Sequence, residues 1–276
     1  MTRPPGSPVL AEGSATAPGH ESERLGFWAV AALILAQFGA ALAFLVPMTF
    51  TLAFRVDQLA PETPEALGYI IGAGSIGTLL SGPLVGILSD RTRTRWGRRR
   101  PFALLGASVG LASVPCMALA EDLIWLGVGW VVASLGWGTV LGAMGNHQAD
   151  RLPASQRGKV AGLAGMTTQL APVTGVLLAG LVTHDRLLVF LLPVLIGLPL
   201  VALFLLFAQD ADSREAVSDR RLTVSAVLAS YVFDPRKHRD YTWVLVGRFV
   251  FFVGLSLVLS YSTFFYATPS ASPSVR

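Results

Sequence analysis

The chain has 276 residues, of which 53% are hydrophobic and only 14% are charged. Soluble domains carry about a quarter charged residues, so this composition excludes a water-soluble globule and places the chain in a lipid bilayer. The formal net charge is +4, and the single cysteine, Cys116, excludes a disulfide framework, a cysteine-based zinc site and an iron–sulfur cluster.

Seven apolar stretches follow an amino-terminal tail, 1–24, that is rich in Pro, Gly, Ser and Ala and is predicted to be disordered. Each stretch is long enough to cross a hydrocarbon core of about 30 Å as a helix. The predicted spans cover residues 25–54, 66–88, 102–120, 123–146, 160–182, 187–208 and 242–266. Charged residues fall between the spans, as expected when a charge at a helix centre costs about 2.5–3.5 kcal/mol. The predicted fold class is an all-α integral membrane protein.

The predicted spans divide the chain into regions. The first six form a bundle over residues 25–208, and a long loop, 209–240, leads to the region 241–266, which contains the seventh span. Within that loop the apolar stretch 222–233 lies between basic residues, which predicts either a helix on the inner leaflet or a patch that docks on the bundle. A short tail, 267–276, rich in Ser and Pro, ends the chain.

The charges of the connecting segments predict the orientation. With the amino terminus inside, seventeen Lys and Arg residues lie in inner segments and only Arg55 and Arg186 lie in outer loops. Cytoplasmic loops of membrane proteins carry this excess of positive charge. We therefore expect a multi-pass protein of the plasma membrane with a cytoplasmic amino terminus.

A glycine-rich stretch in the second span has the spacing of a dinucleotide-binding loop, at Gly72, Gly74 and Gly77. That loop requires a strand before it and a turn at the glycines, whereas here the apolar run continues to residue 88. In a membrane helix, small residues four apart allow neighbouring backbones to approach closely. The pairs with this step are Gly68/Gly72, Gly82/Gly86, Gly106/Gly110, Gly138/Gly142 and Gly158/Gly162. We therefore expect tight helix packing at these glycines and no dinucleotide cofactor. No other cofactor, no metal site and no nucleic-acid partner is expected either.

The loop between the second and third spans carries the most informative motif. A glycine lies four residues before an aspartate at the inner end of the second span, and a cluster of arginines follows. This arrangement resembles the loop signature of the major facilitator superfamily. Its spacing resembles the sugar-symporter branch, which includes glycoside–pentoside–hexuronide and sucrose transporters. The motif residues are Gly86, Asp90, Arg91, Gly97, Arg98 and Arg99.

Two further stretches resemble the same branch. The first span contains Gln37-Phe38-Gly39 followed by Pro47, which is similar to sucrose-transporter helices. The connection between spans four and five has the pattern Asp-x-x-Pro-x-x-x-Arg-Gly-x-x-x-Gly, starting at Asp150 and ending at Gly162. The resemblance extends over about residues 26–266.

The resemblance implies a fold and a function. The fold is the six-helix amino-terminal half of a major-facilitator protein, a 3+3 inverted repeat, plus a seventh helix. Members of the family have twelve spans in two halves that rock around a solute site, so this chain resembles a transporter truncated after its seventh span. The expected solute is a sugar or a related small molecule, and the expected partners are the bilayer and a second half or another copy of the chain.

The motif after the second span implies an inner gate. A carboxylate at Asp90 pairs with an Arg or faces the amino end of a neighbouring helix, and a contact made in only one transporter state acts as a latch. The family resemblance places the partner helix in the second half. For the arginines, an equally good interpretation is a positive anchor for phospholipid head groups.

Polar side chains inside spans are costly and tend to mark solute pathways. Gln37 and Gln169 offer amide donors and acceptors that suit sugar hydroxyls, and the indole of Trp137 suits a pyranose face. The alternative for the amides is helix–helix hydrogen bonding, and the alternative for the indole is packing.

The end of the fourth span carries the coupling candidates. His147 and Asp150 are three residues apart and share a helix face, and such a pair can carry a proton near neutral pH. The alternatives are an exposed, hydrated helix end and a structural pair of Asp150 with Arg157. Melibiose-type relatives have two carboxylates in span two where this chain has Thr78 and Gly82, which leaves a proton, or no coupling ion, as the expectation.

Other membrane proteins fit less well. A retinal protein needs a lysine inside a span, but Lys159 and Lys237 both lie in loops, and seven-helix receptors have an outside amino terminus. A membrane enzyme is not expected, because the chain has no His-Glu-x-x-His and no Gly-x-Ser-x-Gly pattern. The remaining alternative is a non-transporting partner or scaffold that associates through its glycine-rich helix faces.

Overall fold

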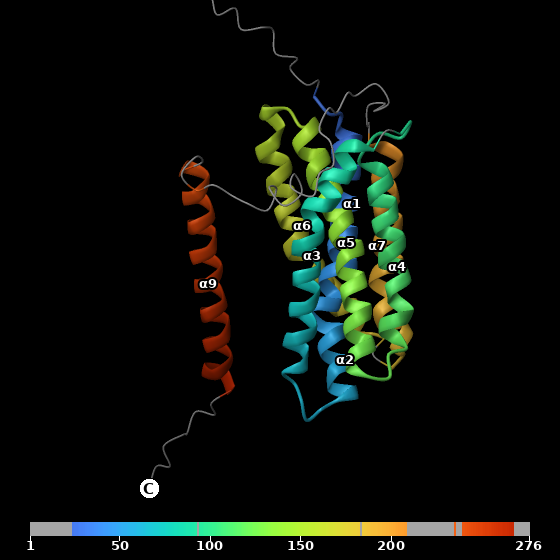
Figure 1. Ribbon diagram of the computed structural model, residues 1–276, viewed down its shortest axis with the longest axis vertical. Helices are drawn as coiled ribbons and strands as arrows, with labels where there is room; N and C mark the ends of the chain where they lie inside the picture. The colour runs from blue at the N-terminus through green and yellow to red at the C-terminus, as the bar shows by residue number, and fades with distance from the viewer. Residues whose placement is uncertain (1–23, 93, 183, 209–234, 236–238, 268–276) are drawn as a thin grey trace, which may run out of the picture. The chain divides into compact units, whose positions relative to one another are not determined.

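The computed structural model describes residues 24–92, 94–182, 184–208, 235 and 239–267, and within these ranges all regular structure is helical (Figure 1). The chain divides into two units, residues 1–220 and 221–276, which we describe separately. Residues 1–23 of the predicted tail 1–24 and the apolar stretch 222–233 lie outside the described residues.

Helices in the first unit follow the predicted spans closely. The first span is one helical segment in which α1 continues through a π-helical stretch, η1, into α2. The elements of this unit are α1 Phe27–Val46, η1 Pro47–Thr51, α2 Leu52–Leu59, α3 Ala66–Arg91, α4 Arg100–Ala118, α5 Leu123–Arg151, α6 Ala154–Gly180 and α7 Arg186–Phe207. In the described residues, five segments are long and apolar enough to cross a membrane: α1–α2, α4, α5, α6 and α7. The prediction of an all-α membrane protein is confirmed.

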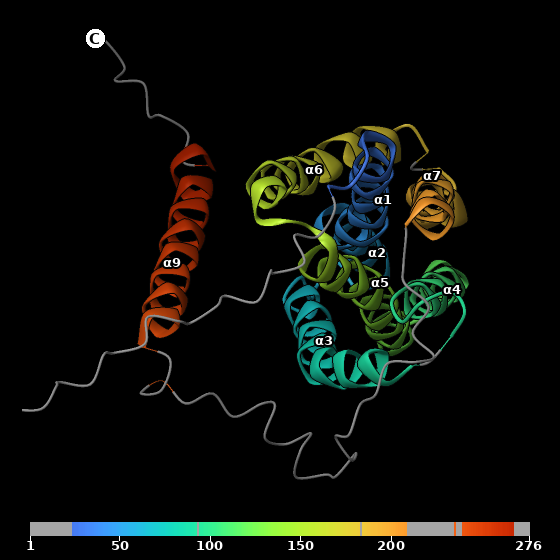
Figure 2. The same cartoon turned by 90° about the horizontal axis from the view of Figure 1, so that it is seen from above.

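The helices of the bundle lie in two rows, seen from above in Figure 2. One row contains α6, α1 and α7, in which α1 packs against both neighbours. The other row contains α3, α5 and α4, in which α5 packs against both neighbours. Contacts of α4 with α7 and of α1 with α5 join the rows. α1 and α5 are therefore the central helices of their rows.

Glycines permit the closest helix contacts. A Cβ atom on Gly39 of α1 would lie 2.6 Å from the carbonyl oxygen of Gly197 on α7. A Cβ atom on Gly106 of α4 would lie 2.6 Å from the carbonyl oxygen of Gly136 on α5. Real Cβ atoms do not approach a backbone oxygen so closely, so both helix pairs depend on glycine at these positions.

The expected packing of the glycine pairs is only partly observed. Gly106 and Gly110 both pack against α5, and Gly138 packs against Thr78 of α3. The expectation is wrong for the other glycines of these pairs, because a Cβ atom there would meet nothing within 4 Å. These positions are Gly68, Gly72, Gly82, Gly86, Gly142, Gly158 and Gly162. Four-residue spacing alone does not say which face of a helix meets a neighbour.

Side chains in the bundle stabilise the helices and their ends. The indole of Trp130 on α5 stacks on Phe44 of α1, with ring centroids 5.6 Å apart and an interplanar angle of 5°. Asp122 caps α5 by accepting a hydrogen bond from the backbone N–H of Trp125. Asp185 caps α7 in the same way. The aspartates that separate the predicted spans therefore begin two of the helices.

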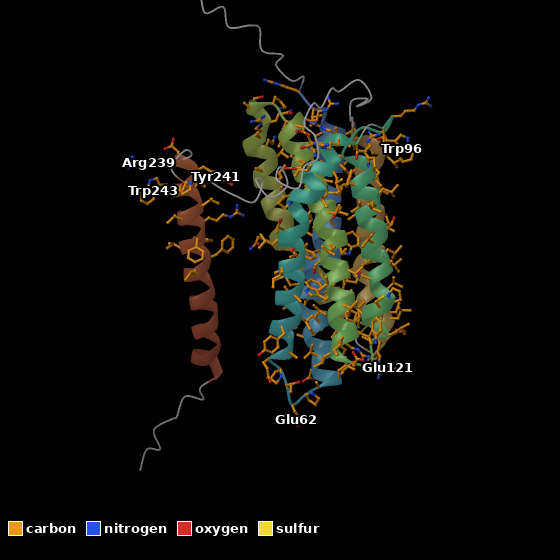
Figure 3. All side chains as sticks on the ribbon, viewed as in Figure 1. Glu62, Trp96, Glu121, Arg239, Tyr241 and Trp243 are labelled. Atoms are coloured by element: carbon orange, nitrogen blue, oxygen red, sulfur yellow. The ribbon has the colours of Figure 1, made fainter. Side chains whose placement is uncertain are left out.

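The second unit contains α9, Arg239–Ala267. Arg239, Tyr241 and Trp243 lie at the beginning of this helix (Figure 3), in the pattern of a basic and aromatic membrane interface. Further along, the guanidinium carbon of Arg248 lies 5.8 Å from the ring centroid of Phe252, which shields the cation with an aromatic face.

Candidate functional site

Four charged side chains meet at one end of the bundle, where α3 and α5 end and α4 begins. Nη2 of Arg99 lies 2.8 Å from Oδ1 of Asp90 and 3.0 Å from Oδ2 of Asp150. Nη2 of Arg98 lies 3.0 Å from Oδ2 of Asp150, and its Nη1 lies 3.8 Å from Oδ1 of Asp90. We call these four residues the four-charge network. It contains two positive and two negative charges and joins three helices.

Arg99 is the buried centre of this network, with 5% of its surface exposed. Its Nε donates a hydrogen bond to Asp150 at 3.1 Å, and its Nη1 donates to the hydroxyl of Ser89. A buried cation is tolerated only when its charge and its donors are both satisfied, and the two carboxylates and the hydroxyl provide this. The side chain of Asp90 stays 53% exposed, so it remains accessible to a further partner. The sequence motif did not identify Ser89.

The glycines of the motif differ in their roles. Gly97 has a φ of 83°, a conformation that favours glycine, and the hydroxyl of Thr94 donates a hydrogen bond to its carbonyl oxygen. This turn places Arg98 and Arg99 at the start of α4. By contrast, a Cβ atom on Gly86 would meet nothing within 4 Å. Arg91 ends α3 and forms none of the ion pairs seen among the described residues.

Two glutamines join the central helices of the two rows. Nε2 of Gln148 on α5 donates a hydrogen bond to Oε1 of Gln37 on α1 at 2.7 Å. Both side chains retain further donors or acceptors, and Gln37 is only half-buried. Gln37 was predicted, but Gln148 was not, although it belongs to the polar run Asn146-His147-Gln148 at the end of a span.

His147 packs inside the bundle. Its ring meets Phe204 of α7 edge-on, with centroids 5.2 Å apart and an interplanar angle of 87°. The alternative that His147 lies at an exposed, hydrated helix end is wrong, because the residue is only 3% exposed. The reason is that α5 extends to Arg151, so His147 lies inside its last turns, where α7 covers it.

Arg157 does not form the structural pair with Asp150 that was one alternative from the sequence. Its Nε donates a hydrogen bond to the carbonyl oxygen of Leu152 at 2.9 Å, while Asp150 binds Arg98 and Arg99. Arg157 therefore stabilises the α5–α6 connection. The last turns of α5 carry His147, Gln148 and Asp150 in sequence, and these contact α7, α1 and the α3–α4 connection, respectively.

The other two predicted solute residues lie apart from each other. Trp137 is fully buried, and Gly110 of α4 lies so close that a Cβ atom there would be 2.6 Å from the indole. The indole of Trp137 therefore has a packing role, which was the alternative to solute contact. Gln169 lies exposed on α6. The structure therefore brings Gln37 together with Gln148, but not with Trp137 or Gln169.

A small cavity of about 80 Å³ lies between α3 and α5. Thr78 and Gly82, the second-span positions considered above for cation coupling, line it together with Thr139 and Asn146. The hydroxyls of Thr78 and Thr139 donate to carbonyl oxygens of their own helices. No carboxylate lines this cavity, and no group of three or more His, Cys, Asp or Glu side chains suited to a metal ion occurs in the part of the chain that the structure describes.

Comparison with known proteins gives a family match over most of the chain. The model of the Major Facilitator Superfamily matches residues 27–272. The chain is 22% identical to an isoprimeverose transporter of Lactiplantibacillus pentosus over 253 residues, which is 84% of this chain and 51% of that protein. It therefore spans about half the length of this relative.

Two shorter matches are closer in sequence. The chain is 37% identical to an uncharacterized symporter of Synechocystis over 85 residues, which is 31% of this chain and 15% of the relative. It is 45% identical to a general alpha-glucoside permease of Schizosaccharomyces pombe over 51 residues, which is 18% of this chain and 9% of the relative. These relatives carry the names of symporters and sugar permeases, which confirms the resemblance noted from the loop motifs.

Proposed function

The chain belongs to the major facilitator superfamily, and from that premise we propose that it forms the amino-terminal bundle of a secondary transporter. The proposed solute is a sugar or a related small molecule, because relatives include an isoprimeverose transporter and an alpha-glucoside permease. The single observation that carries the proposal is the family match over residues 27–272. Transport proceeds by alternating access between this bundle and a second half or another copy of the chain.

The glutamine pair is the proposed solute contact. Gln37 and Gln148 hold each other through one hydrogen bond of 2.7 Å, so their remaining amide groups are oriented before a solute arrives. Amides provide donors and acceptors without a charge, which suits sugar hydroxyls. Gln169 lies apart from this pair, exposed on α6, and is proposed as a separate polar contact on the solute path. Trp137 acts indirectly, because its packing against Gly110 positions α5.

The four-charge network is the proposed inner gate. Asp90 pairs with Arg99 at 2.8 Å and keeps an exposed edge, so a residue of the second half can compete for it when the inner side closes. Asp90→Asn removes the charge and is expected to shift the protein toward inward-open states. Cysteine probes on the two sides of the membrane measure this shift, and unchanged labelling of both probes contradicts the latch.

His147 and Asp150 are the proposed proton-coupling groups. His147 lies buried one helical turn before Asp150, which binds two arginines. Binding or release of a proton at this end of α5 changes the charges that hold α3, α4 and α5 together. His147→Gln is expected to abolish the acceleration of sugar uptake by an inward proton gradient, while sugar binding persists. Full acceleration in this variant contradicts the assignment.

Plasma membrane vesicles that contain the full chain test the transport proposal. Labelled isoprimeverose and labelled maltose are the probes, with a labelled amino acid as the non-sugar control. We expect saturable sugar binding and uptake, and a decrease of about tenfold or more in Gln37→Leu and Gln148→Leu, because each loses a hydrogen-bonding group whose partner stays polar. Cys116→Ala, an exposed position on α4, is the matched control and should bind normally.

Binding is measured beside uptake because binding requires only a preformed site, whereas uptake requires both halves of the alternating-access cycle. Saturable binding without uptake supports the solute site and assigns the missing step to a second half. Absence of both binding and uptake for every sugar tested contradicts the proposal.

A further inference from the structure

A pocket of about 620 Å³ lies outside the four-charge network, where the α3–α4 connection meets the outward face of α4. Its lining includes Arg95, Trp96, Pro101, Leu104, Leu105 and Ser108. We call it the Arg95–Trp96 pocket. It is separate from the proposed solute contact, because none of its lining residues belongs to α1 or α5.

The polar side of this pocket carries positive charge that nearby carboxylates do not neutralise. In the four-charge network, Asp90 and Asp150 are already shared by Arg98 and Arg99. Arg95 is exposed and, within the described residues, forms no ion pair. A cation in this situation attracts an anionic group from outside the protein.

The other side of the pocket is apolar and faces away from the bundle. Leu104 and Leu105 are exposed, whereas Ala103 and Ala107 on the opposite face of α4 are buried in the core. The hydroxyl of Ser108 donates to the carbonyl oxygen of Leu104, so it leaves little polarity in the wall. Hydrocarbon chains match this surface, and water does not.

Trp96 lies where these two sides meet. It is 63% exposed and extends from the end of the bundle opposite Glu62 and Glu121 (Figure 3). Exposed tryptophans concentrate at the level of lipid head groups because the indole has an apolar body and a polar N–H. These three features match the three parts of a lipid. The cation matches the phosphate, the indole matches the glycerol region, and the apolar face of the helix matches the acyl chains.

We propose that the Arg95–Trp96 pocket binds one anionic phospholipid, with its phosphate beside Arg95 and its acyl chains along Leu104 and Leu105. A second pocket on the bundle provides the contrast. It is lined by Trp28, Leu35, Leu203 and Phe207 together with two alanines, so it has an exposed indole but no basic side chain. That pocket should accept acyl chains without selecting the head group.

Fluorescence quenching in reconstituted vesicles tests this proposal with the full chain. Brominated phosphatidylglycerol and brominated phosphatidylcholine are compared as quenchers, and the contribution of Trp96 is the difference between the natural protein and Trp96→Phe. We expect this contribution to be quenched about fivefold more effectively by phosphatidylglycerol, the preference that one Arg near an anionic head group provides. Arg95→Gln should abolish the preference and Arg95→Lys should retain it.

Trp28 is the matched control, measured in the same way with Trp28→Phe, and both lipids should quench it equally. Circular dichroism verifies that each variant keeps its helices. Three outcomes overturn the proposal: equal quenching of Trp96 by the two lipids, a preference that survives Arg95→Gln, and a preference that inorganic phosphate removes. The assay measures no transport, so its failure is distinguishable from a failure of the proposed function.

Discussion

Arg99 and Asp150 are 51 positions apart in the chain, yet Nε of Arg99 donates a hydrogen bond to Oδ2 of Asp150 at 3.1 Å. The same oxygen lies 3.0 Å from Nη2 of Arg99 and 3.0 Å from Nη2 of Arg98. One carboxylate at the end of α5 thus holds the beginning of α4. Any movement of α5 relative to α4 at this end must break or replace these contacts.

Asp150→Asn should destabilise the bundle, because it leaves the buried guanidinium of Arg99 with one carboxylate instead of two. Removing one partner of a buried ion pair costs about 3–5 kcal/mol, and we expect about 2–3 kcal/mol in the free energy of unfolding, because Asp90 remains as a partner. Unfolding in detergent measures this. Glu121→Gln, an exposed carboxylate at the opposite end (Figure 3), is the control, and equal stability of the two variants contradicts the prediction.

Arg55→Ala should loosen the connection between α4 and α5. Nη2 of Arg55 donates to the carbonyl oxygen of Ala120, and Nη1 donates to Oε1 of Gln58 at 3.0 Å. A hydrogen bond from a charged donor contributes about 1.5–3 kcal/mol, so amide exchange at 117–121 should accelerate by about tenfold or more. Arg55→Lys keeps a donor and should show a smaller effect. Unchanged exchange in Arg55→Ala would refute this role.

Gly106→Ala should separate α4 from α5, because the added Cβ would lie 2.6 Å from the carbonyl oxygen of Gly136. Overpacking of this kind costs about 1–3 kcal/mol, measured as a lower thermal unfolding temperature in detergent. Gly68→Ala is the matched control, since a Cβ there meets nothing within 4 Å. Because Ala has a higher helix propensity than Gly, the control should be at least as stable as the natural protein, and a control as unstable as Gly106→Ala would contradict the role of the α4–α5 contact.

Labelling of Cys116 should establish the orientation of the bundle. Cys116 is the only cysteine and lines a cavity of about 510 Å³ with Glu121 and Asp122 at the end of α4 that the positive-inside pattern places outside. A membrane-impermeant maleimide should therefore label it in intact cells. Arg95→Cys in a Cys116→Ser background should react only after permeabilisation. The reverse pattern would invert the predicted topology.

The sequence singled out individual charged and polar residues, but it did not predict most of their contacts. The motif from Gly86 to Arg99 was recognisable because charged and glycine residues stand out at the end of an apolar span. Ser89 and Gln148 were missed, because a hydroxyl or an amide becomes a ligand only when folding brings its partner within about 3 Å. Likewise, the burial of His147 depends on Phe204 of α7, which no local pattern connects to it.

Amino-acid order by itself determined where the long apolar helices lie, since each is a contiguous apolar segment whose backbone hydrogen bonds are satisfied within its own helix. Only the tertiary structure decided which faces of those helices meet. Gly106 and Gly142 have the same local spacing, yet a Cβ atom on Gly106 would meet a neighbouring backbone, whereas one on Gly142 would meet nothing within 4 Å. The difference arises because inter-helix contacts depend on the rotation and crossing of whole helices, which side chains distant in sequence determine together.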